Sequence, residues 1–386
     1  MLRKVLLAIL VGFAVLFVQA QPMRIGLFPT QKFTKIKFAN AIGSYFIIAD
    51  TTFIGVMDHF SFCEISKSVN GTLDIVFHGL KTSGVKELKI IASEREKSVE
   101  ISGIAPSMKA RSFEGDFLVR SNNGSLLIVN QIDLETYLEG VVESEAGTGQ
   151  KLEYYKVQSI ISRTFAMKSK QKHAKDGFDL CNQVHCQAYL HKRNGSPIID
   201  SAIKATRGQI MLHEDSTLAP TFFSANCGGQ TCEPSQVWNA SINGLTSFRD
   251  TFCIYTKQAT WTKQIALSQW KSYLVEKYHY PIDDSTSAAL ILNWSSNTRP
   301  AFLFHPGYGI PMRDLREHFN LKSAYFSVSS DGNMVTLSGR GFGHGVGLCQ
   351  EGAMKMARLS YSYDQILGFY FPLYRLSFIN SNYLLE

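Results

Sequence analysis

Residues 134–172, LETYLEGVVESEAGTGQKLEYYKVQSIISRTFAMKSKQK, contain the clearest change of pattern in the chain. Residues 134–142 carry apolar side chains at helical spacing. After a break of small residues at 146–149, residues 152–172 contain neither glycine nor proline and are apolar along one face. This periodicity predicts two consecutive helices, the second of them long and with one buried face.

The residues upstream, 23–130, alternate between apolar and polar side chains in short runs that turn formers separate. A period of two residues is typical of β-strands with one buried face. Asn122, Asn123 and Gly124 lie between two such runs. Because Asn and Gly tolerate the positive φ of tight hairpin turns, these residues predict a β-hairpin.

Residues 208–229 are predicted to form a pair of strands downstream of the helices, and Glu351–Arg358 a further helix. Residues 255–331 follow no clear pattern and are a candidate insertion. The expected fold class is α+β: a β-rich region over 21–130, followed by a domain over 131–386 in which long helices pack on mixed or antiparallel β structure.

The composition excludes several classes of protein. With 45% hydrophobic and 18% charged residues, the chain of 386 residues is typical of a folded globular protein rather than a disordered one. Its net charge of +7 is spread out, without the basic run of a nucleic-acid-binding arm, so we expect no nucleic-acid partner.

Residues 1–20 combine a basic pair, a continuous apolar stretch and a small-x-Ala sequence, which is typical of a secretory signal peptide. An uncleaved membrane anchor is the alternative, but the apolar run is shorter than the ~20 residues of a spanning helix. No later segment is apolar enough to span a membrane. We therefore expect an exported protein of the periplasm or cell envelope, with no transmembrane segment after cleavage.

Four stretches carry residues suited to chemistry, and the glycine-rich last one is the most specific. They are YLEGVVESEAG (137–147) with QSIISRTFAMK (158–168), FDLCNQVHCQAY (178–189), FFSANCGGQT (222–231) and GRGFGHGVGLCQEGAMKMA (339–357). In order and spacing they resemble the stage II sporulation protein D family, also called SpoIID/LytB. The resemblance implies a SpoIID-like catalytic domain and a peptidoglycan lytic transglycosylase, which acts on glycan strands and especially on strands stripped of stem peptides.

Cleavage of a glycosidic bond needs an acid at the leaving oxygen, and one Glu can provide it if an apolar setting raises its pKa. A hydrolase adds a second carboxylate. A lytic transglycosylase instead lets the C6 hydroxyl of the substrate attack, so the same Glu acts as acid and then as base. The resemblance places Glu145 at the acidic position, with Glu143 as second candidate and a solvated helix-end carboxylate as the alternative. Residues 146–149 differ from the Met-Pro and Trp frequent in the family, so the adjoining loop is altered.

His344 lies between glycines, which let the backbone turn sharply and approach a ligand closely. We expect its imidazole to be exposed and to hydrogen-bond a sugar or the catalytic carboxylate, with an incidental His in a turn as the alternative. Ser224, Arg340, Gln350 and Arg163 are further candidates for substrate binding. Arg163 lies on the long predicted helix, where a structural ion pair is its alternative role.

His173, Cys181, His185 and Cys186 offer two thiols and two imidazoles, the ligand types of tetrahedral zinc. The resemblance supports a structural zinc here, because a similar Cys/His segment with an upstream His holds zinc in a member of the family. A disulfide between Cys181 and Cys186 is the alternative in an exported protein. Since the protein would supply all four ligands, we expect the chemistry itself to need no cofactor.

The chain has seven cysteines, an odd number that internal disulfides cannot pair completely. Cys227 and Cys349 each stand where the family usually has Ser, which suggests a bridge between them, and Cys232 with Cys253 is the second suggested pair. Cα atoms more than about 7 Å apart would exclude either bond. A nucleophilic Cys227 with His344 as its base is the sharper alternative.

The leading prediction is an exported lytic transglycosylase that cleaves between N-acetylmuramic acid and N-acetylglucosamine of peptidoglycan, with Glu145 as acid and base. The second prediction is a peptidoglycan-binding module that recruits or stimulates a cell-wall amidase, as some family members are described. The third is a glucan hydrolase with a partner carboxylate such as Asp250.

Overall fold

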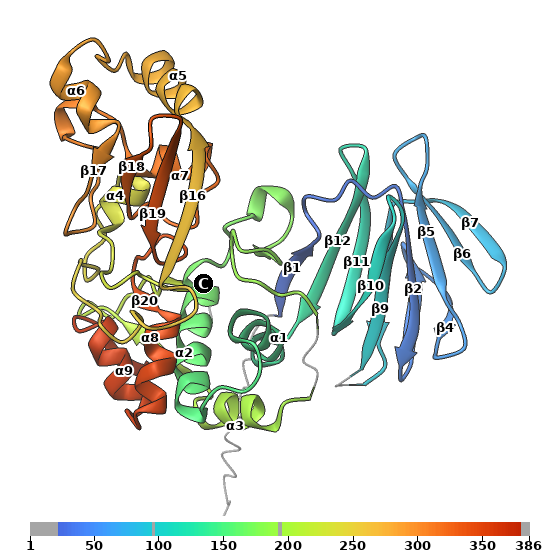
Figure 1. Cartoon of the computed structure of the whole chain (residues 1–386). Coiled ribbons are helices and arrows are strands. Elements are labelled where there is room, and N and C mark those ends of the chain that lie inside the picture. The colour runs from blue at the N-terminus through green and yellow to red at the C-terminus, as the bar shows by residue number, and fades with distance from the viewer. Residues whose placement is uncertain (1–21, 95–96, 192–194, 380–386) are drawn as a thin grey trace, which may run out of the picture.

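The computed structural model describes residues 22–94, 97–191 and 195–379. Figure 1 shows strands on the right, helices in the centre and lower left, and a smaller sheet with its own helices at the upper left. This mixture of helices with mixed and antiparallel sheets confirms the predicted α+β class. None of the described helices is long and apolar enough to cross a membrane. The predicted signal peptide, residues 1–20, lies outside the described residues.

The N-terminal strands form two sheets with one continuous apolar core between them. Phe38 of one sheet meets Phe117 of the other with 5.4 Å between ring centroids. The seven-stranded sheet has the order β13-β1-β12-β11-β8-β3-β4 and the six-stranded sheet the order β10-β9-β2-β5-β6-β7. The strands are β1 Met23–Leu27, β2 Lys35–Ile42, β3 Tyr45–Ala49, β4 Thr52–Met57, β5 Cys63–Lys67, β6 Leu73–Phe77, β7 Leu80–Val85, β8 Glu87–Ala92, β9 Ser98–Ala105, β10 Met108–Glu114, β11 Asp116–Asn122, β12 Ser125–Ile132 and β13 Leu180–Cys181.

The predicted hairpin joins β11 and β12. Asn122 pairs with Ser125, which leaves Asn123 and Gly124 as a two-residue turn with φ angles of 44° and 84°. Two successive positive φ values match the twist of the flanking strands, and Asn-Gly accommodates them at little steric cost. This part of the prediction is confirmed.

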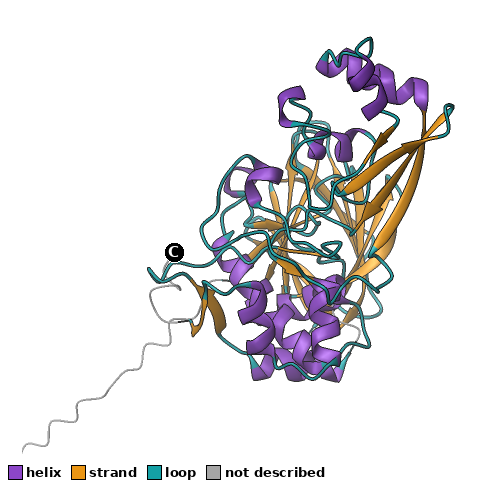
Figure 2. Cartoon of the chain, turned by 60° about the vertical axis from the view of Figure 1, so that its left-hand side comes forward, coloured by secondary structure: helices purple, strands orange, loops and turns teal. Residues whose placement is uncertain are grey.

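The helices that follow share a second apolar core. They are α1 Leu134–Ala146, α2 Leu152–Lys168, α3 Pro197–Ala205, α8 Gln350–Arg358 and α9 Tyr363–Tyr370, with the short helices η1 Ala174–Asp176 and α4 Pro234–Trp238 between them. Figure 2 shows a group of helices gathered at the bottom of the molecule. Asp133 caps α1, because its carboxylate accepts hydrogen bonds from the backbone N–H groups of Glu135 and Thr136.

The predicted boundaries of the two long helices differ from the observed ones. Helix α1 continues past residue 142 to Ala146, so that Glu145 lies on its last turn. Helix α2 ends at Lys168, four residues before the predicted end at 172. Gln171 has a φ of 72°, a left-handed conformation that no α-helix continues through.

Residues 208–229 do contain two strands, as predicted, but these strands do not pair with each other. Strand β14, Gln209–Leu212, pairs with β21, Arg375–Phe378, near the C-terminus. Strand β15, Phe223–Ser224, pairs in parallel with β20, Leu348–Cys349. The partners of both strands therefore come from distant parts of the chain, which places the FFSANCGGQT and glycine-rich motifs side by side.

A third apolar core belongs to the smaller sheet, whose strand order is β16-β19-β18-β17. Thr260 at its start pairs with Arg340 at its end, so the chain enters and leaves this unit at one place. Its elements are β16 Thr260–Ala266, α5 Leu267–Tyr278, α6 Ser285–Leu290, β17 Asn293–Trp294, η2 Pro306–Tyr308, α7 Met312–His318, β18 Phe326–Ser330 and β19 Met334–Arg340.

Candidate active site

Glu145 is half-buried at the end of α1. Its Oε1 accepts a 2.6 Å hydrogen bond from the backbone N–H of Ala188. Burial raises the pKa of this carboxyl above its usual value, although the hydrogen bond from Ala188 acts in the opposite direction. Among the described residues, no Lys, Arg or His forms an ion pair with Glu145. The carboxyl therefore keeps its proton to a higher pH than an exposed one, as a general acid requires.

The same pKa shift predicts a pH-dependent effect on stability. Because the folded protein binds the Glu145 proton more tightly than the unfolded chain does, wild-type stability falls as pH rises through the interval between the usual and the raised pKa. Glu145→Gln removes this ionisation. We expect the variant to be more stable than the wild type near pH 7, by about 0.5–2 kcal/mol, with the difference vanishing below the usual carboxyl pKa. Calorimetric Tm values measured from pH 4 to pH 8 test this, and a difference independent of pH would contradict it.

Gln350 links the glycine-rich motif to the helix that carries Glu145. Its Nε2 donates to the backbone carbonyl of Glu145 at 3.5 Å and to Oε1 of Gln158 at 3.2 Å. The same Oε1 of Gln158 accepts a 3.0 Å hydrogen bond from the Tyr154 hydroxyl. The Nε2 of Gln158 donates to Oγ of Ser162 at 3.0 Å. This buried polar chain joins α1, α2 and α8, and it brings Gln350 and Glu145 together.

His344 is held by the backbone of its own loop. Its Nδ1 accepts a 3.0 Å hydrogen bond from the N–H of Val346, and the ring also hydrogen-bonds to the backbone of Phe223. Burial and the charges of Arg299 and Arg316 lower its pKa to about 4, so the ring is neutral at pH 7. The imidazole is half-buried rather than fully exposed as expected, because the pairing of β15 with β20 brings its loop against Phe223.

Ser224 stabilises the loop that carries His344, because its Oγ accepts a 3.1 Å hydrogen bond from the N–H of Gly345. Gly345 has a φ of 77°, and a Cβ at this position would collide with the guanidinium of Arg299. That guanidinium donates to the carbonyls of His344 and Cys227, both at 3.0 Å. The glycine is required for this close approach, which fixes the loop beside β15.

Arg163 is wrong as a substrate-binding residue. Its side chain is fully buried, and it donates to the two carboxylate oxygens of Glu135 at 2.8 and 2.7 Å. A third hydrogen bond, of 3.0 Å, reaches the carbonyl of Gln209. Arg340 is exposed, but its Nη1 donates to the hydroxyl of Tyr325 at 3.1 Å, within the smaller sheet. The structure therefore brings neither arginine to Glu145 through a hydrogen bond.

The four predicted zinc ligands, His173, Cys181, His185 and Cys186, lie within 4.8 Å of one another. Both sulfurs are 3.8 Å from Nδ1 of His185, and both cysteines are free. Nδ1 of His173 is 2.8 Å from the carboxylate of Asp176, while its Nε2 is buried without a hydrogen-bond partner. Two sulfurs, two imidazoles and a carboxylate behind one imidazole fit a tetrahedral zinc site.

The segment that carries this cluster also positions the acid. Cys181 belongs to β13, which pairs with β1, and Ala188 follows Cys186 by two residues. The hydrogen bond from Cys186 lowers the pKa of the Cys181 thiol, which favours its thiolate form. A bound cation would therefore rigidify the residues immediately before the N–H group that holds Glu145.

The predicted Cys232–Cys253 pair is wrong. Sγ of Cys253 lies 3.5 Å from Sγ of Cys227, whereas Sγ of Cys232 donates to Gln236 at 3.3 Å. Cys227 and Cys349 do lie side by side, and both are free and fully buried. A buried thiol beside a carboxylate and two further sulfurs is not placed to attack a polymer.

Asp250 is also unavailable to activate water in a hydrolase. It is fully buried, and its Oδ2 accepts a 2.9 Å hydrogen bond from the hydroxyl of Tyr370. Its Oδ1 accepts a 2.9 Å bond from the N–H of Phe252. Asp250 is therefore not positioned as the partner carboxylate of a hydrolase.

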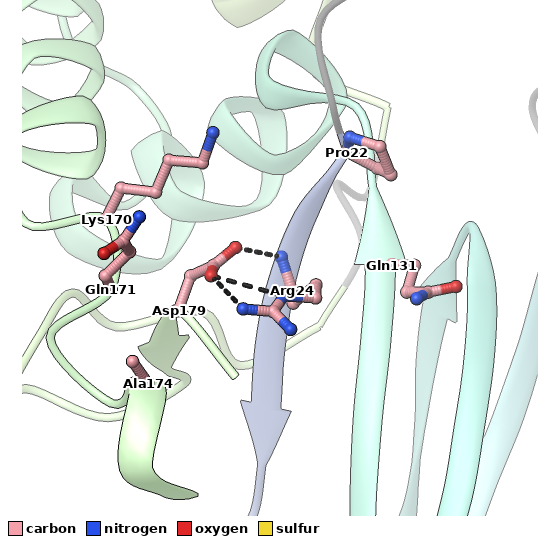
Figure 3. Close-up of a pocket in the computed structure, with 7 residues that line it drawn as sticks. All are labelled: Pro22, Arg24, Gln131, Lys170, Gln171, Ala174 and Asp179. Carbon is pink, nitrogen blue, oxygen red and sulfur yellow. Dashed lines mark hydrogen bonds and ion pairs between the residues drawn. The ribbon is translucent and has the colours of Figure 1, made fainter. Parts of the chain in front are cut away.

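A cavity of about 400 Å³ lies between β1 and the end of α2. Figure 3 shows Arg24 and Asp179 joined across it, with 2.8 Å between Nη2 and Oδ1. Lys170 and Gln171 also line it. None of the predicted catalytic or substrate-binding residues lines this cavity, so it is not a candidate for the chemistry.

Two contributors to the site were missed from the sequence. The backbone N–H of Ala188 has no signature in a side-chain pattern. Gln158 lies in a quoted motif, and its position among the apolar residues of α2 was an available signal, because a buried amide requires partners.

Comparison with known proteins agrees with this arrangement. Residues 122–213, which include Glu145 and the Cys/His cluster, match the family model SpoIID, "Stage II sporulation protein". The chain is 27% identical over 315 residues to an uncharacterized protein of Brachyspira hyodysenteriae, with 80% of this chain and 82% of the relative covered.

Two relatives of Bacillus subtilis carry descriptive names. The chain is 28% identical over 258 residues to its "Stage II sporulation protein D", with 63% of this chain and 74% of that protein covered. It is 25% identical over 285 residues to its "Amidase enhancer", with 61% of this chain but only 39% of that protein covered. Its motifs, the family match over residues 122–213 and these relatives together support the SpoIID family for this chain.

Proposed function

We propose that this protein is an exported lytic transglycosylase that cleaves the N-acetylmuramic acid to N-acetylglucosamine bonds of peptidoglycan glycan strands. One observation carries the proposal: the Glu145 carboxyl is half-buried, has a raised pKa and forms no ion pair with any described residue. Because peptidoglycan is the substrate, the protein would act in the periplasm or cell envelope. The names of the sporulation and amidase-enhancer relatives agree with a role at the cell wall.

The reaction needs only one carboxyl group. Protonated Glu145 donates its proton to the glycosidic oxygen as the bond from that oxygen to C1 of the muramic acid breaks. The C6 hydroxyl of the same sugar then bonds to C1 and returns its proton to the Glu145 carboxylate. The products are a new sugar hydroxyl and a 1,6-anhydro ring, no water is consumed, and the acid is regenerated.

The placement of Glu143 supports a single-carboxyl mechanism. Glu143 and Glu145 lie two positions apart on α1, so their side chains leave the helix in different directions. Glu143 is also buried, with only 7% of its surface exposed. A retaining or inverting hydrolase needs a second carboxyl group facing the first across the substrate, and Glu143 is not so oriented.

The test is incubation of the protein with intact and peptide-stripped peptidoglycan, followed by mass analysis of the soluble products. Anhydro products, lighter by one water than hydrolysis products, support the proposal. Hydrolysis products would replace it with a hydrolase. Binding to glycan strands without new chain ends would favour the second candidate, a module that recruits or stimulates a wall amidase, which the amidase-enhancer relative suggests.

Zinc at the Cys/His cluster is proposed to be structural. His173, Cys181, His185 and Cys186 would hold it, and it would supply a cross-link between η1, β13 and the loop before Ala188. The proton transfers belong to Glu145 alone. No cofactor is therefore assigned to the chemistry.

Loss of this cross-link is expected to lower stability. With free zinc at one hundred times Kd, bound metal adds about 2.7 kcal/mol to the free energy of unfolding. His185→Ala should therefore lose the part of the zinc-dependent gain that the Cys/His cluster supplies, whereas Cys232→Ser, a buried cysteine outside the cluster, should keep all of it. The measurement is the Tm shift between zinc and chelator for each protein. A full zinc-dependent shift in His185→Ala would count against the site.

A further inference from the structure

A second group of metal-ligating side chains lies in the helical core, apart from the Cys/His cluster. Cys227, Asp250, Cys253 and Cys349 are fully buried, and one ligand atom from each lies within 4.8 Å of the others. They come from the loop after β15, the segment before β16 and strand β20. We propose that these four side chains bind a zinc ion, as a second structural metal centre.

The spacing of the ligand atoms suits zinc better than a disulfide. Bond lengths of about 2.3 Å to sulfur and 2.0–2.2 Å to oxygen place tetrahedral ligands about 3.6–3.8 Å apart. Sγ of Cys227 lies 3.5 Å from Sγ of Cys253 and 3.3 Å from Oδ2 of Asp250. A disulfide needs sulfurs about 2.05 Å apart and would leave the third thiol and the carboxylate unused.

Hydrogen bonds from neighbouring groups reach the sulfur and oxygen atoms of the cluster. The N–H of Cys227 donates to Sγ of Cys349 at 3.3 Å, and the backbone of Gly228 and Gly229 hydrogen-bonds to Cys253. The hydroxyl of Tyr370 donates to the Asp250 oxygen that faces Cys227. Such outer hydrogen bonds orient metal ligands and stabilise their charged forms.

The composition of the ligand set is also one that zinc accepts. Three thiolates, one carboxylate and Zn²⁺ carry the same net charge as a four-cysteine structural zinc site, an arrangement that proteins use widely.

The centre would fasten the two C-terminal motifs to each other. Cys227 belongs to FFSANCGGQT, and Cys349 immediately precedes Gln350, whose side chain contacts the backbone of Glu145. All four ligands come from protein, so no coordination position is left for substrate. The proposed role is structural, and it holds whether or not Glu145 is catalytic.

The test is native mass spectrometry of the folded full chain, purified without oxidant and loaded with Zn²⁺. In a His185→Ala background, which removes the first cluster, we expect one zinc per chain. Adding Cys253→Ser or Asp250→Asn should remove it, while adding Cys232→Ser, a buried cysteine outside the cluster, should not. Zinc content unchanged by Cys253→Ser and Asp250→Asn would overturn the proposal.

A second measurement on the unmutated chain keeps the test independent of variant folding. Cys227, Cys253 and Cys349 should resist alkylation in the zinc-loaded protein and react after a chelator is added. Protection that persists in chelator without zinc release would overturn the proposal. An intact mass lower by two hydrogens, with a disulfide mapped among these three cysteines, would also overturn it.

Discussion

Glu145→Gln is expected to lower the rate of anhydro-product release from glycan strands by a factor of about 10²–10⁴, the range contributed by a positioned general acid. Gln has nearly the same shape and its amide oxygen still accepts the hydrogen bond from Ala188, but it has no proton to donate. Because the substitution removes an ionisable group from a half-buried position, the fold should persist. The measurement is the initial rate of product release, with circular dichroism to verify the fold.

The matched control is Glu143→Gln, the same chemical change two residues earlier on α1. We expect this variant to release product within a few-fold of the wild-type rate, since the Glu143 side chain leaves the helix in another direction. Equal losses in both variants would indicate a shared structural effect. A wild-type rate in Glu145→Gln would remove this residue from the mechanism.

Glu135→Ala is expected to destabilise the protein by about 3–5 kcal/mol, the largest stability effect among these predictions. Arg163 is fully buried, and Glu135 supplies the only acidic group that forms an ion pair with it among the described residues. Removal of the carboxylate leaves a guanidinium charge in the helical core, where its one remaining neutral acceptor is the carbonyl of Gln209. Urea denaturation followed by circular dichroism measures the loss.

A surface ion pair provides the comparison. Arg120 pairs with Glu87 on the first sheet, but the arginine side chain is 53% exposed. Water screens such a pair, so Arg120→Ala should cost no more than about 1 kcal/mol. If Glu135→Ala cost as little as Arg120→Ala, the buried pair would not be what holds α1 against α2.

Local signals in the sequence predicted the elements whose conformation depends on near neighbours. The Asn-Gly turn and the strands on either side of it follow from backbone preferences within a few residues. Helices α1 and α2 follow from apolar spacing, although the left-handed Gln171 ended α2 early. Such preferences act over one or two turns of chain and need no knowledge of the fold.

The candidate site was predictable only in part for the same reason. The resemblance to the family pointed to Glu145, and the Cys/His cluster converges on one point because its residues lie close in sequence. His344 was misjudged because its partners include Phe223, which reaches it only through the pairing of β15 with β20. From the sequence, Arg163 could bind substrate or form a structural ion pair. In the structure it forms an ion pair with Glu135.

The sequence by itself determined the α+β class, the hairpin, the two central helices and the identity of the side chains able to carry chemistry, because these depend on local pattern and residue type. Only the tertiary structure decided that Cys253 joins Cys227 and Cys349, that β14 pairs with the C-terminal β21, and that burial raises the pKa of Glu145. Pairing partners, burial and electric environment arise from contacts between distant segments, and they exist only once the chain has folded.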